Sequence, residues 1–153
     1  MDLERAHDAM QRLARFVGRW DMEAIFPSNP GQKLPGGSAV FEWMKGQNLL
    51  VQRTEVPIPE VPDSISIVAY DEDTNGYVQH YFDSRGIVRL YRMSFEDGLW
   101  TLLREAPDFS PLDFTQRYAG TFSDDGNTIR GAWETSTNGH WQKDFDVSYF
   151  RTD

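Results

Sequence analysis

The sequence contains no cysteine, no long apolar run and no cluster of basic residues, and each absence excludes a class of protein. Without cysteine, the 153-residue chain forms no disulfide, no thiolate metal site and no thiol nucleophile. This agrees with a reducing compartment, and the charged first residues lack the apolar core of a secretory signal, so we expect a cytoplasmic protein. No run approaches the roughly 18 apolar residues of a transmembrane helix.

The charge balance is acidic. The chain has 15 Lys and Arg residues against 24 Asp and Glu residues, a net charge of −9, and its basic residues are scattered. Nucleic acids and anionic membranes attract basic clusters, so neither is an expected partner. The composition, 39% hydrophobic and 14% aromatic, is ample for one core. We predict a single domain over residues 1–153.

Helical spacing is confined to the start of the chain. Asp2 is placed to cap a helix and Gly18 to stop it, and the apolar positions between them recur at helical intervals: Leu3, Ala6, Met10 and Leu13. The pattern predicts one helix over about 2–16.

The rest of the chain is typical of short strands separated by turns rich in Gly, Asn-Gly or Pro. We predict an all-β fold: a closed antiparallel up-and-down β-barrel of about ten strands over residues 18–151. The expected strands are about 19–27, 37–45, 48–56, 65–71, 76–82, 87–95, 99–106, 114–122, 128–136 and 140–151. Three longer loops contain proline (27–36, 57–63 and 106–113), and either they form plain corners or at least one forms the rim of a ligand mouth.

Alternation of side chains along strands assigns an inner face to the first and last strands. The first strand places Trp20, Met22, Ala24 and Phe26 inside. In the last strand the inner set is Trp141, Phe145, Val147, Tyr149 and Arg151. Because these strands are neighbours in a closed meander, we expect the Arg151 guanidinium to lie across the Trp20 indole.

Gly18-Arg19-Trp20 after a helix, ten strands and an inward Arg151 resemble the calycin superfamily of lipocalins, fatty-acid-binding proteins and nitrobindins. The segments 81–86 (YFDSRG), 122–126 (FSDDG) and 133–136 (WETS) resemble an uncharacterised bacterial family of such barrels. The resemblance implies a fold rather than an activity. Nitrobindins hold haem through a His near the chain end, but residues 149–153 contain none and His140 is the nearest, so no haem is expected.

The middle strands carry apolar bulk on both faces, which favours a homodimer interface on the outer one. Arg92 and Arg104 are candidates for inward cations among apolar neighbours. Gln79, Tyr81 and Tyr118 are candidates for inward polar groups beside them. An inward arginine would anchor the polar head of a lipophilic acid. The alternatives are an ion pair with Glu55, Glu105 or Glu134, or exposure on the outer face.

Two further patterns carry less weight. Residues 71–76 (DEDTNG) copy the start of a calcium-binding EF loop, but its twelfth position is Phe82 in place of the bidentate Glu, so a hairpin turn explains them better. The histidines His7, His80 and His140 share no metal-ligand spacing. His80 stays a candidate general base if it faces inward.

These features favour a barrel that binds a small, largely apolar ligand in its interior, without metal or cofactor. The predicted ligand-binding residues are Met22, Phe26, His80, Tyr91, Arg92, Trp100, Arg104, Trp133 and Phe145. One alternative is a metal-independent isomerase, cyclase or hydratase using His80, Glu134 or Tyr91 as acid or base. Another is an interaction protein whose barrel is filled with side chains.

Overall fold

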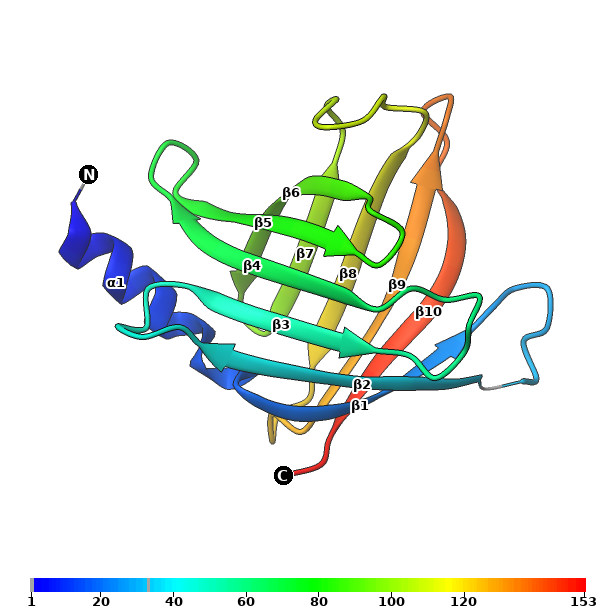
Figure 1. Cartoon of the computed structure of the whole chain (residues 1–153), viewed down its shortest axis with the longest axis horizontal. Helices are drawn as coiled ribbons and strands as arrows, with labels where there is room; N and C mark the ends of the chain where they lie inside the picture. The colour runs from blue at the N-terminus through cyan, green and yellow to red at the C-terminus, as the bar shows by residue number, and fades with distance from the viewer. Residues whose placement is uncertain (1, 33) are drawn as a thin grey trace.

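The computed structural model describes residues 2–32 and 34–153. A short helix precedes ten strands (Figure 1). The elements are α1 (Leu3–Gln11), the 3-10 helix η1 (Arg12–Phe16), β1 (Gly18–Ile25), β2 (Leu34–Trp43), β3 (Leu50–Glu55), β4 (Ser64–Asp71), β5 (Gly76–Asp83), β6 (Val88–Glu96), β7 (Leu99–Arg104), β8 (Thr115–Phe122), β9 (Thr128–Ser136) and β10 (Gln142–Arg151).

Each strand pairs antiparallel with the next in sequence, and β1 pairs with β10, so the sheet closes into an up-and-down barrel. The predicted fold class is therefore confirmed, including the ten strands and the N-terminal helix. The strand bounds differ from the expected ranges by a few residues, because ladder pairing rather than side-chain pattern sets where a strand stops.

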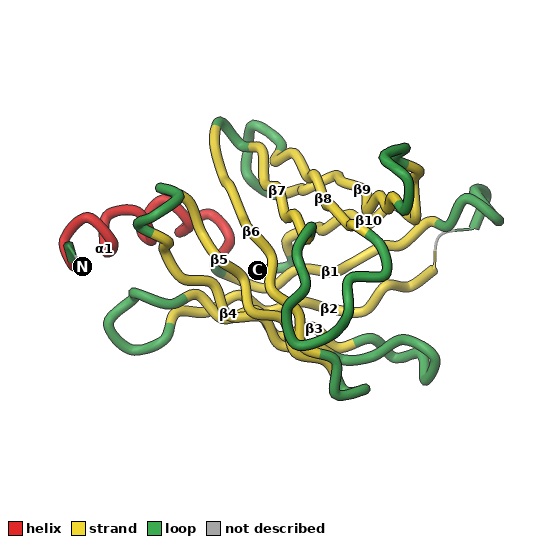
Figure 2. The backbone as a smooth tube through the Cα atoms, turned by 90° about the horizontal axis from the view of Figure 1, so that it is seen from above, coloured by secondary structure: helices red, strands yellow, loops and turns green. Residues whose placement is uncertain are grey.

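The connections define two ends of the barrel. The β2–β3, β4–β5, β6–β7 and β8–β9 hairpins lie at one end, here called the closed end. The loops β1–β2, β3–β4, β5–β6, β7–β8 and β9–β10 lie at the other, the open end. Figures 1 and 2 show α1 beside the closed-end hairpins, away from the β1–β2 and β3–β4 loops.

The predicted helix over 2–16 is present but divides into α1 and η1. Asp2 caps it, because the Asp2 carboxylate accepts a 3.0 Å hydrogen bond from the Arg5 backbone N–H. The apolar residues at its end turn into the barrel, where Leu13 and Phe16 are fully buried. A 3-10 segment is a frequent way for a helix to tighten its last turn. The two segments together cover the closed end.

An aromatic cluster fills the closed end beneath them. Phe16 lies at its centre, with ring centroids 5.0–5.3 Å from those of Phe41, Phe95, Trp100 and Phe122. Rings tilted or edge-on at such distances add to the stabilisation from burial alone. The cavity inside the barrel lies toward the open end.

The predicted pairing of Trp20 with Arg151 is confirmed. The two residues are directly opposite in the β1–β10 ladder, and the Arg151 Cζ lies 4.1 Å from the Trp20 ring centroid. Arg151 also donates to the carbonyl oxygens of Val17 (2.8 Å) and Gly126 (3.3 Å). Trp20 itself is buried and donates to the Phe16 carbonyl at 2.9 Å. One guanidinium therefore joins the helix end, the first strand and the β8–β9 hairpin.

The predicted inner face of the last strand is wrong at its start. A β-bulge between Lys143 and Phe145 shifts the register of β10 against β9. An extra residue in one strand reverses the alternation beyond it. As a result Trp141 packs against the guanidinium of Arg117, 3.9 Å from its ring centroid, rather than continuing the inner row. Alternation alone gives no sign of such a bulge.

Among the described residues, no helix has the length and apolar character needed to cross a membrane. Several large apolar side chains are exposed on the outside of the barrel, including Ile65 and Phe82, which are paired across β4 and β5. The homodimer expected from such an outer face stays a prediction.

Candidate ligand cavity

The open end of the barrel encloses a cavity of about 570 Å³. This volume falls within the range of roughly 300–1,000 Å³ typical of small-molecule sites. Side chains from nine of the ten strands line it, and Val61 and Pro62 of the β3–β4 loop join them at the rim. The interior is therefore open at this end rather than filled. Of the three proline loops, that between β3 and β4 contributes to the mouth.

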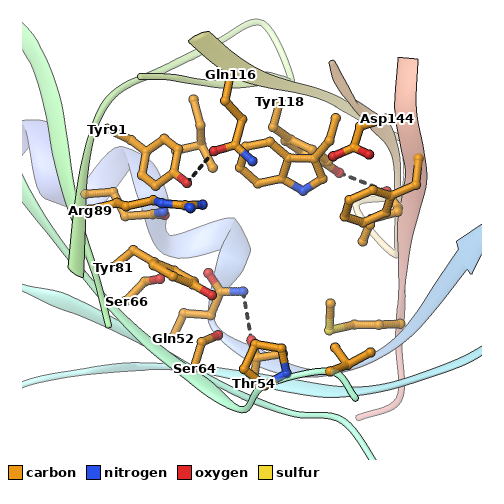
Figure 3. Close-up of a pocket in the computed structure, with 18 of the residues that line it drawn as sticks. Gln52, Thr54, Ser64, Ser66, Tyr81, Arg89, Tyr91, Gln116, Tyr118 and Asp144 are labelled. Carbon is orange, nitrogen blue, oxygen red and sulfur yellow. Dashed lines mark hydrogen bonds between the residues drawn. The ribbon is translucent and has the colours of Figure 1, made fainter. Parts of the chain in front are cut away.

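The cavity has two unlike sides. Its polar wall is formed by the adjacent strands β3, β4 and β5, and consists of Gln52, Thr54, Ser64, Ser66 and Gln79. Its apolar wall is formed by the strands that run from β7 to β1 around the barrel, and consists of Met22, Trp100, Leu102, Tyr118, Trp133, Phe145 and Val147. Figure 3 shows Gln52, Thr54, Ser64 and Ser66 facing Gln116 and Tyr118 across the space. Strand β6 lies between the two walls.

The polar wall consists of amide and hydroxyl groups that are largely buried. Gln52 donates through Nε2 to Thr54 Oγ1 at 3.2 Å. Ser66 and Gln79 beside them are each only 4% exposed. Buried polar groups of this kind are normally satisfied by protein, water or a ligand. The wall is therefore suited to hydroxyl or carbonyl groups on what enters.

The apolar wall is held rigid by contacts among its rings. Tyr118 lies 5.0 Å from Trp100 and 5.3 Å from Trp133 between ring centroids, and its hydroxyl donates to the Val147 carbonyl at 3.0 Å. Burial raises the pKa of Tyr118 well above its usual value, so the phenol stays protonated. Fixed rings present a flat, preformed surface.

Three arginines lie near the cavity, and two of them are paired. Arg85 bonds Asp83 at 2.7 Å, and Arg104 bonds Asp108 at 2.8 Å with both side chains only 2% exposed. Burial acts to raise the pKa of Asp83, but hydrogen bonds from Arg85 and Tyr81 outweigh it and the pKa is lowered. The hydrogen bond from Arg104 lowers the pKa of Asp108 strongly. Both carboxylates are therefore ionised and occupied.

Arg89, the third, has no carboxylate partner within the described chain. Its Nε is buried without a hydrogen-bond acceptor, and its Cζ lies 5.8 Å from the Phe114 ring centroid. Figure 3 shows the guanidinium reaching into the cavity between Tyr91 and Tyr81. Tyr81 is its direct neighbour across the β5–β6 ladder. Arg89 thus brings to the cavity a positive charge with no ion-pair partner among the described residues.

Gln116 faces the same space from β8. The Tyr91 hydroxyl donates to Gln116 Oε1 at 2.9 Å, which orients the amide. Burial raises the pKa of Tyr91 and outweighs the hydrogen bond with Arg89, which acts to lower it, so this hydroxyl keeps its proton. With its oxygen occupied, the Gln116 amide has its NH₂ group left to donate.

Asp144 supplies a negative charge at the opposite side of the cavity (Figure 3). It lies at the β10 bulge, which turns it toward the cavity beside Phe145. Desolvation raises its pKa. An inward carboxylate here is unexpected from the alternation of the last strand, which places Asp144 outside.

The family model for "Protein of unknown function (DUF1579)" matches residues 5–151 of this chain. The chain belongs to this family. A search of the curated proteins found no match. Among solved structures, the crystal structure of Rv2717c from M. tuberculosis is similar, with a TM-score of 0.60 and 15% sequence identity over 95% of this chain and 98% of that one. At that identity the likeness concerns the fold alone.

In this DUF1579 barrel, five of the nine sequence-predicted residues line the cavity: Met22, Tyr91, Trp100, Trp133 and Phe145. Phe26 follows the end of β1 and stacks on Phe145 with 4.9 Å between ring centroids, so it packs against a cavity residue without itself lining the cavity. Whether these residues contact a ligand stays a prediction.

Arg92 and Arg104 do not lie where an anchor inside the cavity would be. Arg92 is exposed on the outer face and pairs with Glu105, since it follows inward Tyr91 and neighbours in a strand face opposite sides. Arg104 has the inward direction, but Asp108 of the β7–β8 loop binds it and it does not line the cavity. Arg89, two residues before Tyr91 and therefore on the same face, does line the cavity.

Two of the three acid–base candidates, His80 and Glu134, do not line the cavity. His80 lies between Gln79 and Tyr81, both of which line the cavity, so it faces outward between Ile67 and Leu90 of the neighbouring strands. Glu134 pairs with Arg117 at 2.9 Å and does not line the cavity. Only Tyr91 of that set is inside. The structure thus offers no support for catalysis by His80 or Glu134 there.

The acidic segment 71–76 serves as a hairpin turn. Asp71 accepts hydrogen bonds from the Asp73 backbone (3.1 Å) and the Thr74 hydroxyl (3.1 Å), and Asn75 takes a positive φ of 54° before Gly76. No cluster of three or more metal-ligating side chains occurs among the described residues.

Proposed function

We propose that this protein binds a small, largely apolar organic molecule inside its barrel. The observation that carries the proposal is the cavity of about 570 Å³, with one rigid aromatic wall and a few convergent polar groups. Sites of this composition bury most of a ligand's surface while their polar groups orient it. The kinship with calycins, the cytoplasmic location and the homodimer belong to the same proposal as expectations from the sequence.

Native mass spectrometry of the protein as purified, with an absorption spectrum, tests the binding function. We expect a retained organic mass of small-molecule size that is released on denaturation. A Soret band would identify haem and contradict the expectation of a cofactor-free barrel.

A matched pair of variants locates the retained molecule. Ser66→Phe places a ring in the cavity, whereas Ile65→Phe places the same ring on the outer face of β4. We expect Ser66→Phe to abolish the retained mass and Ile65→Phe to preserve it. Equal retention by both variants would show that the molecule binds elsewhere.

A further inference from the structure

We propose that the ligand is an organic monoanion with a rigid ring body, whose acidic group binds Arg89 and Gln116 and whose hydroxyl or carbonyl groups face the polar wall. This inference rests on the proposed binding function and names its ligand class.

The first argument is the unmet hydrogen-bonding capacity of Arg89. Its side chain hydrogen-bonds Tyr91, but its Nε is buried without an acceptor. The nearby carboxylates are taken: Asp83 by Arg85 and Tyr81, Asp108 by Arg104 and the Leu90 backbone. A guanidinium has five donors and accepts nothing. A buried donor without an acceptor costs free energy, and the cost is larger when the donor is charged. An acceptor with negative charge, supplied by a ligand, would satisfy it.

Two further groups beside the cavity have donors without a recorded acceptor. The Gln116 amide is held through its oxygen by Tyr91, which leaves its NH₂ group. The indole Nε1 of Trp100, another cavity residue, is buried without an acceptor. Because Arg89, Gln116 and Trp100 all have donors to offer, the complementary ligand is rich in acceptor oxygens.

The two walls determine the shape of the ligand's body. A plain alkyl chain would leave Gln52, Ser66 and Gln79 against hydrocarbon, which is unfavourable for polar groups. A flat ring system with oxygen substituents along one side would contact the aromatic wall with its apolar surface and the polar wall with its oxygens. The cavity therefore fits a hydroxylated ring compound better than a fatty chain.

Asp144 limits the charge of the ligand. Its carboxylate faces the cavity from the side opposite Arg89 (Figure 3). A second acidic group at that end would meet a like charge, whereas a hydroxyl could donate to it. The site therefore suits one negative charge, placed at the Arg89 end.

Isothermal titration calorimetry with matched probes tests this assignment. The probes are a hydroxynaphthoate, the corresponding neutral hydroxynaphthamide, and dodecanoate as a chain acid. We expect the naphthoate to bind at least about tenfold more tightly than the amide. Both can accept hydrogen bonds from Arg89, but only the carboxylate adds an opposite charge and two equivalent acceptor oxygens. We also expect it to bind more tightly than dodecanoate.

Variants of this chain separate the roles of the charges. Arg89→Met is expected to remove the preference for the acid, and Arg89→Lys to retain part of it, because lysine keeps the charge without the planar fork. Arg92→Met, on the same strand but outside the barrel, is the matched control and should leave it unchanged. Asp144→Asn is expected to tighten binding of the acid several-fold.

Each contrary outcome has a distinct meaning. Equal affinity for acid and amide, or an unchanged preference in a folded Arg89→Met protein, overturns the anionic ligand and leaves the binding function intact. Tighter binding of dodecanoate than of the naphthoate overturns the ring body. A retained native mass that proves to be neutral overturns the whole inference. No binding of any probe together with no retained mass overturns the proposed function as well.

Discussion

In the described part of the chain, the guanidinium groups of Arg104 and Arg89 differ in their partners: that of Arg104 is paired with a carboxylate, and that of Arg89 is not. The side chains of Arg104 and Asp108 are each 2% exposed and joined by two hydrogen bonds of 2.8 and 2.9 Å. Arg89 has no such partner within the described chain. Breaking a buried pair leaves a charge alone in the interior, whereas removing an unpaired charge leaves none. The two positions should therefore respond differently to the same substitution.

Arg104→Met is expected to destabilise the fold by about 3–5 kcal/mol, since it leaves Asp108 buried and unpaired. Arg89→Met is expected to leave the unfolding free energy of the ligand-free protein unchanged or to raise it. Urea denaturation of the two variants and the parent measures this. Equal losses would show that Arg89 is a structural residue and not a free cation.

The Arg104–Asp108 pair also sets a pH dependence. Hydrogen bonding to Arg104 lowers the pKa of Asp108 in the folded state below the value of about 3.9 typical of unfolded chains. A lowered folded pKa contributes stability that is complete above the unfolded pKa and is lost as pH falls toward the folded one. We expect the unfolding free energy of the parent to fall more steeply below about pH 5 than that of Asp108→Asn. Parallel pH profiles would contradict this.

At the scale of strands, a pair of glycines in β8 and β9 makes room for the apolar wall. Gly120 and Gly131 are directly opposite, and the Tyr118 ring lies over both. A methyl group on Gly131 would come within 2.4 Å of the Tyr118 hydroxyl and 2.6 Å of the Ala119 backbone oxygen. The position of Tyr118 in the apolar wall thus depends on Gly131, two strands away from Trp100, having no side chain.

Gly131→Ala is therefore expected to destabilise the protein by about 1–3 kcal/mol, as overpacking does, and to weaken ligand binding by displacing Tyr118. Gly31→Ala serves as the control, because a methyl there meets nothing within 4 Å. That change should stay within about 0.5 kcal/mol. Thermal unfolding of both variants decides; a neutral Gly131→Ala would show that Tyr118 moves freely.

The elements themselves were largely predictable. Alternation and turn residues such as Asn75-Gly76 place each strand, because local pleat and turn geometry depend on nearby residues. The β10 bulge was not predictable, since it depends on how β10 registers with β9. Its consequences, an inward Asp144 and an outer Trp141, were missed with it.

At the scale of the whole molecule, closure of the barrel depends on Arg151. Its guanidinium covers Trp20 and donates to carbonyl groups of the chain before β1 and of the β8–β9 hairpin. The contact with Val17 joins residues 134 apart in sequence. They secure the end opposite the cavity, where the barrel is densely packed.

Arg151→Lys is expected to cost about 2–3 kcal/mol of stability, because lysine keeps the charge but not the planar fork that bonds several carbonyls at once. Hydrogen exchange should quicken in β1 and β10, while ligand affinity at the open end changes little. A loss of affinity equal to the loss of stability would show that the two ends are coupled.

By itself the sequence determined the barrel, its ten strands, the capped helix and the Trp20–Arg151 closure, since these follow from local periodicity and from the closure of a meander. Only the tertiary structure decided which charges face the cavity. Arg92, Arg104 and Arg89 look alike in the sequence, yet Arg92 pairs with Glu105 on the exposed outer face and Arg104 is neutralised by a loop carboxylate. Arg89 lines the cavity with its Nε buried and without an acceptor. The reason is physical: the partner of a charged side chain is chosen by three-dimensional proximity, which residue spacing does not encode.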